Sequence, residues 1–159
     1  GCYLGQRVSD LLRLTKKNII SKGNMKFVEL IQQKTNKKVT VLLHPKVIEI
    51  LEKRKYNFPY LYSQNIGSAS SIFNKLIKIV TEESGLTNKI FGAKVNPKTN
   101  RKESGVYSKH ELITSHICRR SFATYFYGDI PTPLLINITG LSTEKDFLNY
   151  IGKASIDYA

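Results

Sequence analysis

Cysteine is scarce in this sequence of 159 residues, which contains only Cys2 and Cys118. One pair so far apart along the chain provides neither a disulfide framework nor the closely spaced ligands of a zinc site. The scarcity excludes disulfide-stapled small domains and fits a reducing cytosol. We therefore expect both cysteines to be reduced thiols in the core, and we expect no bound metal.

Long apolar runs and targeting signals are absent as well. No window approaches the roughly 18 apolar residues of a membrane span, and neither a signal peptide nor an internal repeat is visible. The length suits one domain that buries a core without disulfides or metals. We expect a soluble cytoplasmic protein with no membrane partner. Because the sequence starts abruptly at Gly1, we also expect it to be a fragment of a longer protein.

Acidic residues are few relative to basic ones. Twelve Asp and Glu against 25 Lys and Arg give a net charge of +13 and a pI near 9.8. Residues 16–38 contain seven lysines and one acid, and residues 94–109 contain five basic residues and one acid. Such an excess is typical of nucleic-acid binders, whose basic side chains face phosphates. Charge alone leaves a solvated lysine-rich surface as the alternative.

Hydrophobic periodicity predicts an α+β domain, mainly α-helical with a small antiparallel sheet. The spacing of Val8, Leu11 and Leu12 predicts an amphipathic helix over 5–13. Segments 25–33 and 39–43 predict a hairpin with a lysine-studded tip, and the polar segment 93–106 is expected to be an exposed loop. Start and stop signals predict five more helices: from Pro45 to before the break at 57–59, over 68–84, after Ser115, from Pro131 to Gly140, and from Ser142 or Thr143, where Asp146 completes a capping box.

The segment HICRRSFATYFYG (116–128) places charge in a helix that otherwise reads as buried. His116 and Arg119 are i, i+3 neighbours near the positive end of the helix dipole. An arginine fork matches two phosphate oxygens, and an imidazole beside it can donate or accept a proton near neutral pH. The alternative is that His116 caps the helix and that Arg119 and Arg120 are surface charges.

Four segments follow one another along the chain: CYLGQRVSDLLRL, QQKTNKKVTVLL, HICR and ITGLSTEKDFLNYI. In this order they resemble the catalytic domain of the tyrosine recombinases, the phage integrase family. The opening CYLGQRVSDLLRL resembles the first arginine box of that family, which puts Arg7 and Asp10 on its positions. The resemblance implies that Asp10 holds the Arg7 guanidinium. The hairpin QQKTNKKVTVLL is similar to the hairpin that carries the catalytic lysine, here Lys34.

The two remaining segments lie in the last third of the chain. His116 and Arg119 match the His-x-x-Arg of the second box, and ITGLSTEKDFLNYI resembles the segment that ends at the nucleophilic tyrosine, here Tyr150. Core packing beside Phe147 is the alternative for Tyr150. Directly after the glycine of that segment the family usually carries histidine or tryptophan, whereas this sequence has Leu141, which cannot donate a hydrogen bond to phosphate. A catalytically impaired DNA-binding module of the same fold therefore stays open.

The resemblance implies site-specific DNA recombination through a 3′-phosphotyrosyl intermediate, in the integration or excision of a mobile element. Tyr150 would attack the phosphodiester, and Arg7 and Arg119 would neutralise its charge in place of a metal. Lys34 would protonate the leaving 5′ oxygen, and His116 would take the tyrosine proton or hydrogen-bond the phosphate. No cofactor is implied. Type IB topoisomerases share this chemistry, so strand relaxation is a further alternative.

The implied partner is double-stranded DNA in a bacterial cytoplasm, with the bound protein associated with the nucleoid. We expect residues 1–159 to be the catalytic domain without the N-terminal core-binding domain. We expect a monomer as an isolated domain and a tetramer on DNA in the full-length protein. Six basic residues outside the boxes are expected to bind DNA: Lys37, Lys38, Lys98, Arg101, Lys102 and Arg120.

Overall fold

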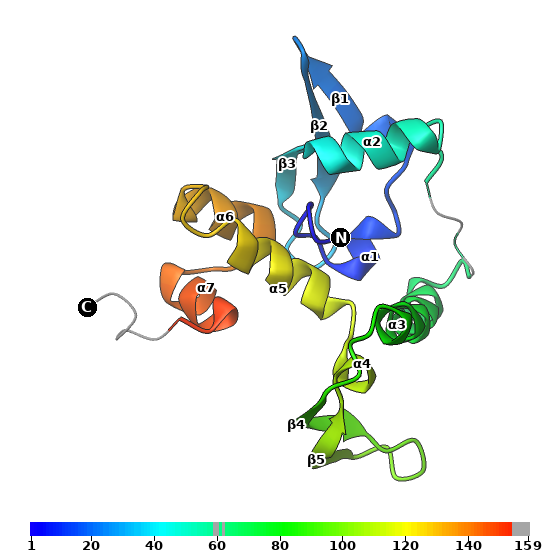
Figure 1. Cartoon of the computed structure of the whole chain (residues 1–159). Helices are drawn as coiled ribbons and strands as arrows, with labels where there is room; N and C mark the ends of the chain where they lie inside the picture. The colour runs from blue at the N-terminus through cyan, green and yellow to red at the C-terminus, as the bar shows by residue number, and fades with distance from the viewer. Residues whose placement is uncertain (59–60, 62, 154–159) are drawn as a thin grey trace. The chain divides into compact units, whose positions relative to one another are not determined.

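The computed structural model describes residues 1–58, 61 and 63–153, which form two compact units (Figure 1). One unit joins residues 1–61 to residues 116–159, and the other comprises residues 62–115. The first unit contains α1 (Val8–Leu11), the 3₁₀ turn η1 (Lys16–Asn18), β1 (Ile19–Lys22), β2 (Met25–Ile31), β3 (Lys38–Leu42), α2 (Pro45–Lys53), α5 (His116–Tyr125), α6 (Thr132–Thr139) and α7 (Glu144–Ile151). The second contains α3 (Ile66–Glu83), β4 (Lys89–Val95), β5 (Lys102–Ser108) and α4 (Lys109–Leu112). The predicted mainly helical α+β class is confirmed.

The first unit is built on a three-stranded antiparallel sheet with the order β1-β2-β3. Val28 pairs with Val41 and Leu30 with Val39, and these four side chains are buried while their neighbours in β3 are exposed. The period of two thus places one face of the hairpin on the core. The predicted hairpin is confirmed. Strand β1 was not predicted, because none of its side chains is fully buried and it lacks an alternating pattern.

Helix α1 is a single turn, so the predicted helix over 5–13 is wrong at both ends. Gly5 has a φ of +64°, and a Cβ at this position would collide with the Phe122 ring. Only glycine combines that left-handed backbone with such a close approach. The chain therefore turns sharply against α5 immediately before Arg7, and Val8 and Leu11 become partly buried one turn later.

Helices α5, α6 and α7 lie together in Figure 1 and contribute much of the first unit's core. Phe122, Leu135 and Phe147 are all at most 2% exposed. Gly140, whose φ of 56° is left-handed, caps the end of helix α6. Thr143 caps the start of α7, and its Oγ1 accepts a hydrogen bond from the Asp146 N–H at 3.0 Å. Both predicted boundaries are confirmed, and they set where α7 starts relative to the core.

The second unit contains the two-stranded antiparallel ribbon β4–β5, in which Gly92 pairs with Gly105. The prediction of an exposed loop over 93–106 is therefore wrong except at 96–101, where the Asn96 N–H donates to the Arg101 carbonyl at 2.8 Å. The ribbon could not be predicted from the sequence, because no residue of either strand is fully buried and the strands therefore lack an alternating apolar pattern.

The other predicted helices are present as α2 and α3, with bounds that differ by a few residues. Pro59, part of the break expected after α2, lies outside the described residues. Both cysteines are free; the core prediction is confirmed for Cys118 and wrong for Cys2, which is exposed. Within the described ranges, none of the helices combines the length and the apolar character needed to cross a bilayer.

Candidate active site

Three segments of the first unit bring four of the predicted catalytic side chains together. Arg7 directly precedes α1, His116 and Arg119 lie on the first turn of α5, and Tyr150 lies near the end of α7. The rings of His116 and Tyr150 meet edge to face with centroids 5.2 Å apart. Both arginines are close enough to shift the pKa of each ring. Residues separated by more than 100 positions therefore form one site.

Local packing explains this convergence. Phe122 lies one helical turn after Arg119, and Arg7 lies two residues after Gly5. The contact between Gly5 and Phe122 therefore places Arg7 next to Arg119. On α7, Phe147 is 0% exposed and lies one turn before Tyr150. With Phe147 anchored in the core, the i+3 position falls at the edge of that core, beside α5.

Each of the two guanidinium groups has one buried nitrogen without an acceptor among the described residues. Arg119 is 2% exposed. The Nη1 atoms of Arg7 and Arg119 are buried and have no hydrogen-bond partner in the described part of the chain. Burial and the charge of Arg7 lower the pKa of Arg119 to about 10, so the Arg119 guanidinium remains cationic at neutral pH. An uncompensated buried charge typically costs about 3 to 5 kcal/mol, so this arrangement favours an anion between the two arginines.

The Tyr150 hydroxyl lies in the same place. Its oxygen is buried and has no hydrogen-bond partner among the described residues. Burial raises the pKa of Tyr150 above its ordinary value, although the charges of Arg119, Arg120 and Arg7 act in the opposite direction. Arg119 therefore lies close to this oxygen. The phenol is protonated at neutral pH and needs a base before it can act as a nucleophile.

His116 can supply that base. Partial burial of the ring, followed by the charges of Arg119, Arg7 and Arg120, lowers the pKa of His116 below 6.5. The imidazole is consequently neutral at pH 7, with a nitrogen lone pair free to accept a proton. It stands against the Tyr150 ring and at the solvent-facing edge of the site, since His116 itself is exposed.

We expect this electrostatic arrangement to be visible in a titration. The proton NMR midpoint of His116 should lie below 6.5, and Arg120→Gln should move it upward because one of the opposing charges is removed. Since the folded-state pKa is depressed, the contribution of His116 to stability is fully present above pH 6.5 and is lost as the pH falls below that value. His116→Gln should remove this part of the pH dependence of the melting temperature. A midpoint at or above 6.5 in the parent would contradict the arrangement.

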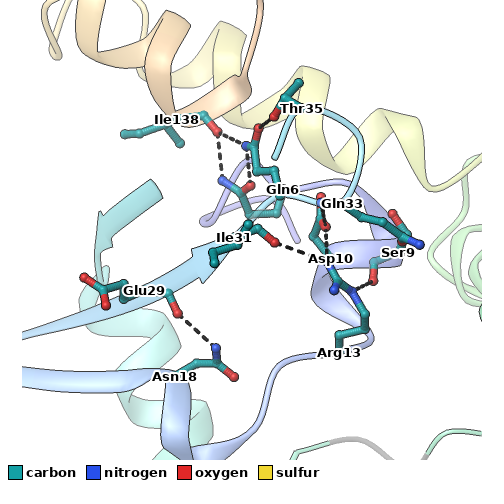
Figure 2. Close-up of polar contacts among 11 residues, drawn as sticks. Gln6, Ser9, Asp10, Arg13, Asn18, Glu29, Ile31, Gln33, Thr35 and Ile138 are labelled. Atoms are coloured by element: carbon teal, nitrogen blue, oxygen red, sulfur yellow. Dashed lines mark hydrogen bonds and ion pairs between the residues drawn. The ribbon is translucent and has the colours of Figure 1, made fainter. Parts of the chain in front are cut away.

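Asp10 has a different partner from the one expected. Its carboxylate is fully buried and pairs with Arg13 at 2.7 Å, and the same oxygen accepts the Gln33 N–H at 2.9 Å (Figure 2). The expected pairing with Arg7 is corrected accordingly. The reason is geometric: with α1 reduced to one turn, Asp10 lies inside the turn and faces the end of β2. Its charge still acts on the cationic pair, since it favours the charged form of Arg119.

Lys34 and Leu141 lie on the segments that flank the cluster. Lys34 is exposed in the turn between β2 and β3 and makes no hydrogen bond or ion pair with the described residues. The structure therefore does not bring its amine into the cluster. Leu141 is partly buried against the core, and its N–H donates to the Ile136 carbonyl at 3.2 Å.

The six predicted DNA-binding residues are exposed and belong to both units. Lys37 and Lys38 flank the end of the β2–β3 turn, where Lys38 pairs with Glu29 at 3.0 Å, and Arg120 follows Arg119 on α5. For Arg120 the alternative of a surface charge agrees with its exposure, whereas for Arg119 burial excludes it. The remaining three belong to the second unit: Lys98 and Arg101 lie in the turn between β4 and β5, and Lys102 is the first residue of β5.

Two site-supporting residues, Gln6 and Gln32, were missed by the sequence analysis. They are 1% and 0% exposed and hydrogen-bond to each other, with Gln32 Nε2 donating to Gln6 Oε1 at 2.8 Å. A signal was available for Gln32, because it continues the buried alternation of Val28 and Leu30 by one more period. No pattern marked Gln6.

Known structures share this fold at low sequence identity. A XerH site-specific recombinase bound to a palindromic difH substrate is 20% identical with a TM-score of 0.59, over 94% of this chain and 39% of that one. XerA recombinase is 13% identical with a TM-score of 0.64, over 99% of this chain and 51% of that one. A lambda integrase dimer bound to a COC′ core site is 18% identical with a TM-score of 0.60, over 97% of this chain and 50% of that one. No protein-family model and no curated protein matches the sequence.

These similarities concern the fold. The chain spans between 39% and 51% of the length of the three solved chains. The chain therefore has the fold of the catalytic domain of the tyrosine recombinases.

Proposed function

We propose that this chain is the catalytic domain of a site-specific recombinase that cleaves and rejoins double-stranded DNA through a 3′-phosphotyrosyl intermediate, in the integration or excision of a mobile element. The observation that carries the proposal is that the buried, unpaired atoms of the first unit include Nη1 of Arg7, Nη1 of Arg119 and the hydroxyl oxygen of Tyr150, and that both arginines are close enough to act on Tyr150. Two cations and a nucleophile gathered in this way suit a phosphodiester.

The arginines would bind the scissile phosphate. Its two non-bridging oxygens would accept charge-assisted hydrogen bonds from Arg7 and Arg119, which satisfies the buried donors and offsets the repulsion between the guanidinium groups. Negative charge grows on these oxygens in the transition state. The same contacts therefore strengthen as the reaction proceeds, and they provide the charge stabilisation that a metal supplies in other phosphoryl transfers.

Proton transfers complete the reaction. Tyr150 loses its proton to the neutral imidazole of His116 and attacks the phosphorus, and the bond from phosphorus to the 5′ oxygen breaks. The 3′ phosphate stays on Tyr150, and the 5′ oxygen leaves with a proton from Lys34. A 5′-hydroxyl of a partner strand reverses these steps and rejoins the DNA. Energy from the broken bond is conserved in the phosphotyrosine, so no nucleotide is consumed.

Exposed basic residues support DNA as the partner. Twenty-five Lys and Arg residues against 12 Asp and Glu residues give the chain a net charge of +13. Lys37 lies on the same turn as Lys34, and Arg120 lies on the same helix as Arg119. The XerH and lambda integrase structures are complexes with a DNA substrate or core site. Contacts with the phosphate backbone would orient the duplex so that one phosphate enters the site.

Covalent trapping tests the proposal. A nicked suicide duplex taken from the ends of the encoding element should yield a protein–DNA adduct that survives denaturing electrophoresis, because the cleaved fragment diffuses away and prevents religation. The alternative of a DNA-binding module without catalysis is favoured by Leu141, which packs as a core residue and offers phosphate no hydrogen bond. Tight DNA binding without any adduct, in both the parent and Leu141→His, would establish that alternative.

Lys34 has a role that can be tested separately. A general acid is needed only when the leaving oxygen is basic, and it typically contributes about 10²- to 10⁴-fold. Lys34→Ala should therefore lose about that factor on ordinary DNA and recover on DNA with a 5′-bridging phosphorothiolate, whose sulfur leaves without a proton. Single-turnover cleavage of both substrates measures the difference.

Lys37 and Lys38 provide matched controls on the same turn. Lys37→Ala and Lys38→Ala should weaken DNA binding without any preference for the phosphorothiolate, since neither delivers the proton. If all three lysine variants respond alike, Lys34 belongs only to the basic surface.

A further inference from the structure

We propose that Gln32 is a positioning residue, which holds the Lys34 turn in register with the end of α6, where the chain leads into the helix of Tyr150. The catalytic consequence rests on the proposed function, whereas the structural claim stands on contacts alone. Lys34 itself is exposed and unpaired within the described ranges, so its location depends on its neighbours. Buried hydrogen bonds on both sides of it fix those neighbours.

On the C-terminal side of Lys34, the turn is tied to the Gln32 side chain. Gln32 Oε1 accepts the hydroxyl of Thr35 at 2.8 Å. The Gln32 carbonyl accepts the Asn36 N–H at 2.9 Å, and the Gln32 N–H donates to the Lys37 carbonyl, also at 2.9 Å. One fully buried residue thus closes the turn through both its main chain and its side chain.

On the N-terminal side, the turn is tied to α1. The Gln33 N–H donates to Asp10 Oδ1 at 2.9 Å, and Arg13 Nη2 donates to the Ile31 carbonyl at 3.2 Å (Figure 2). Asp10 and Arg13 are themselves paired. The segment that begins at Arg7 therefore holds one side of the Lys34 turn, and Gln32 holds the other.

The amide of Gln32 extends this connection to α6. Gln32 Nε2 donates to the Ile138 carbonyl at 2.9 Å and to Gln6 Oε1 at 2.8 Å. Gln6 Nε2 donates to the same Ile138 carbonyl at 2.9 Å, as Figure 2 shows. This carbonyl lies in the last turn of α6, where helical carbonyls lack a backbone donor. Two side-chain amides satisfy it, and so join the residue before Arg7, the lysine turn and α6.

Gly140 shows how closely Gln32 approaches this helix end. A Cβ at position 140 would collide with Gln32 Oε1, and the backbone there is left-handed with a φ of 56°. Leu141, Ser142 and the cap of α7 follow directly. Motion of Gln32 would therefore reach both the general acid and the start of the helix that carries the nucleophile.

Limited proteolysis of the whole chain tests the structural claim without any reaction. Trypsin cleavage after Lys34, followed by mass spectrometry, should be about fivefold faster or more in Gln32→Leu, because at least one net hydrogen bond that opposes local opening is lost. Cleavage after Lys53, in α2 of the same unit, should stay within about twofold. Gln33→Leu is the matched control, since that side chain is exposed and only its backbone is held.

If Gln32→Leu does not fold, Thr35→Val replaces it, because Val keeps the shape of this part-buried side chain and removes only its bond to Gln32. It should also speed cleavage after Lys34 selectively. Equal cleavage after Lys34 in the parent and in a folded variant, or equal acceleration at Lys34 and Lys53, would overturn the proposal.

The catalytic consequence has its own readout. Gln32→Leu should lose about tenfold or more in cleavage of ordinary DNA and less than about threefold with the 5′-bridging phosphorothiolate, because only the former needs the lysine proton. A purely structural defect would slow both substrates equally and would remove the catalytic part of the inference. A parent inert on both substrates would defeat the proposed function, while the proteolysis would still decide whether Gln32 holds the turn.

Discussion

Tyr150→Phe is expected to abolish the covalent adduct entirely and to leave DNA affinity within a few-fold of the parent. Only the Tyr150 hydroxyl is lost, and this oxygen is buried without a hydrogen-bond partner among the described residues. Removing an unsatisfied buried polar group sacrifices no protein hydrogen bond, so the melting temperature should be equal or higher. Denaturing electrophoresis after incubation with a suicide duplex measures the adduct, and a binding titration measures the affinity.

Tyr125→Phe is the matched control for this experiment. Tyr125 lies at the end of α5 and is 66% exposed, so the same substitution there should leave the adduct intact. An adduct that persists in Tyr150→Phe would overturn the assignment. Peptide mapping would then identify the attacking residue, with Tyr127 and Tyr158 as the nearest candidates in sequence; Tyr158 lies outside the described residues.

Arg119→Met is expected to reduce cleavage by about 10²-fold or more, in line with the loss of other preorganised donors that act on transition-state charge. Methionine keeps much of the volume of the buried stem and removes a cation whose Nη1 atom has no partner among the residues that the structure describes. Its burial and the nearby Arg7 charge already disfavour the charged form, as the lowered pKa of Arg119 shows. We therefore expect the melting temperature to rise or stay unchanged while activity collapses.

This opposition of stability and activity separates a catalytic arginine from a structural one. Single-turnover cleavage and thermal unfolding of the same samples provide both quantities. Arg120→Met, on the exposed face of α5, should change DNA affinity and its salt dependence and should leave the chemical step nearly unaffected. A loss of cleavage below about threefold in Arg119→Met, or a marked drop in its melting temperature, would assign Arg119 to the fold instead of to the reaction.

Much of the fold followed from local patterns. The hairpin of β2 and β3, the proline start of α2, the glycine end of α6 and the cap of α7 depend on residues close together in the chain, so periodicity and capping rules predict them. The same rules overlooked β1 and the β4–β5 ribbon. Their side chains are mostly exposed, and backbone pairing without a buried face leaves no periodic signature in the sequence.

The chemistry of the site was also visible before the structure, as residue types and their order. The pair His116 and Arg119, one turn apart on a helix, is a local feature, and the resemblance to tyrosine recombinases added Arg7, Lys34 and Tyr150 as candidates. Their catalytic roles remain predictions. What the sequence determined on its own was this set of residues and the excess of positive charge around them.

Burial and partners were decided only by tertiary packing. Gly5 against Phe122 brings Arg7 to Arg119, and one buried nitrogen of each guanidinium group has no acceptor in the described ranges. No local rule states that two arginines will share such a site. Asp10 pairs with Arg13 because α1 is only one turn long. Gln32 links the hairpin to α6 because the Ile138 carbonyl, in the last turn of that helix, is free to accept a hydrogen bond from the Gln32 amide. Such contacts join residues as far as 132 positions apart, as between Gln6 and Ile138. Sequence patterns record spacing along the chain, whereas desolvation and hydrogen bonding depend on which surfaces meet in space.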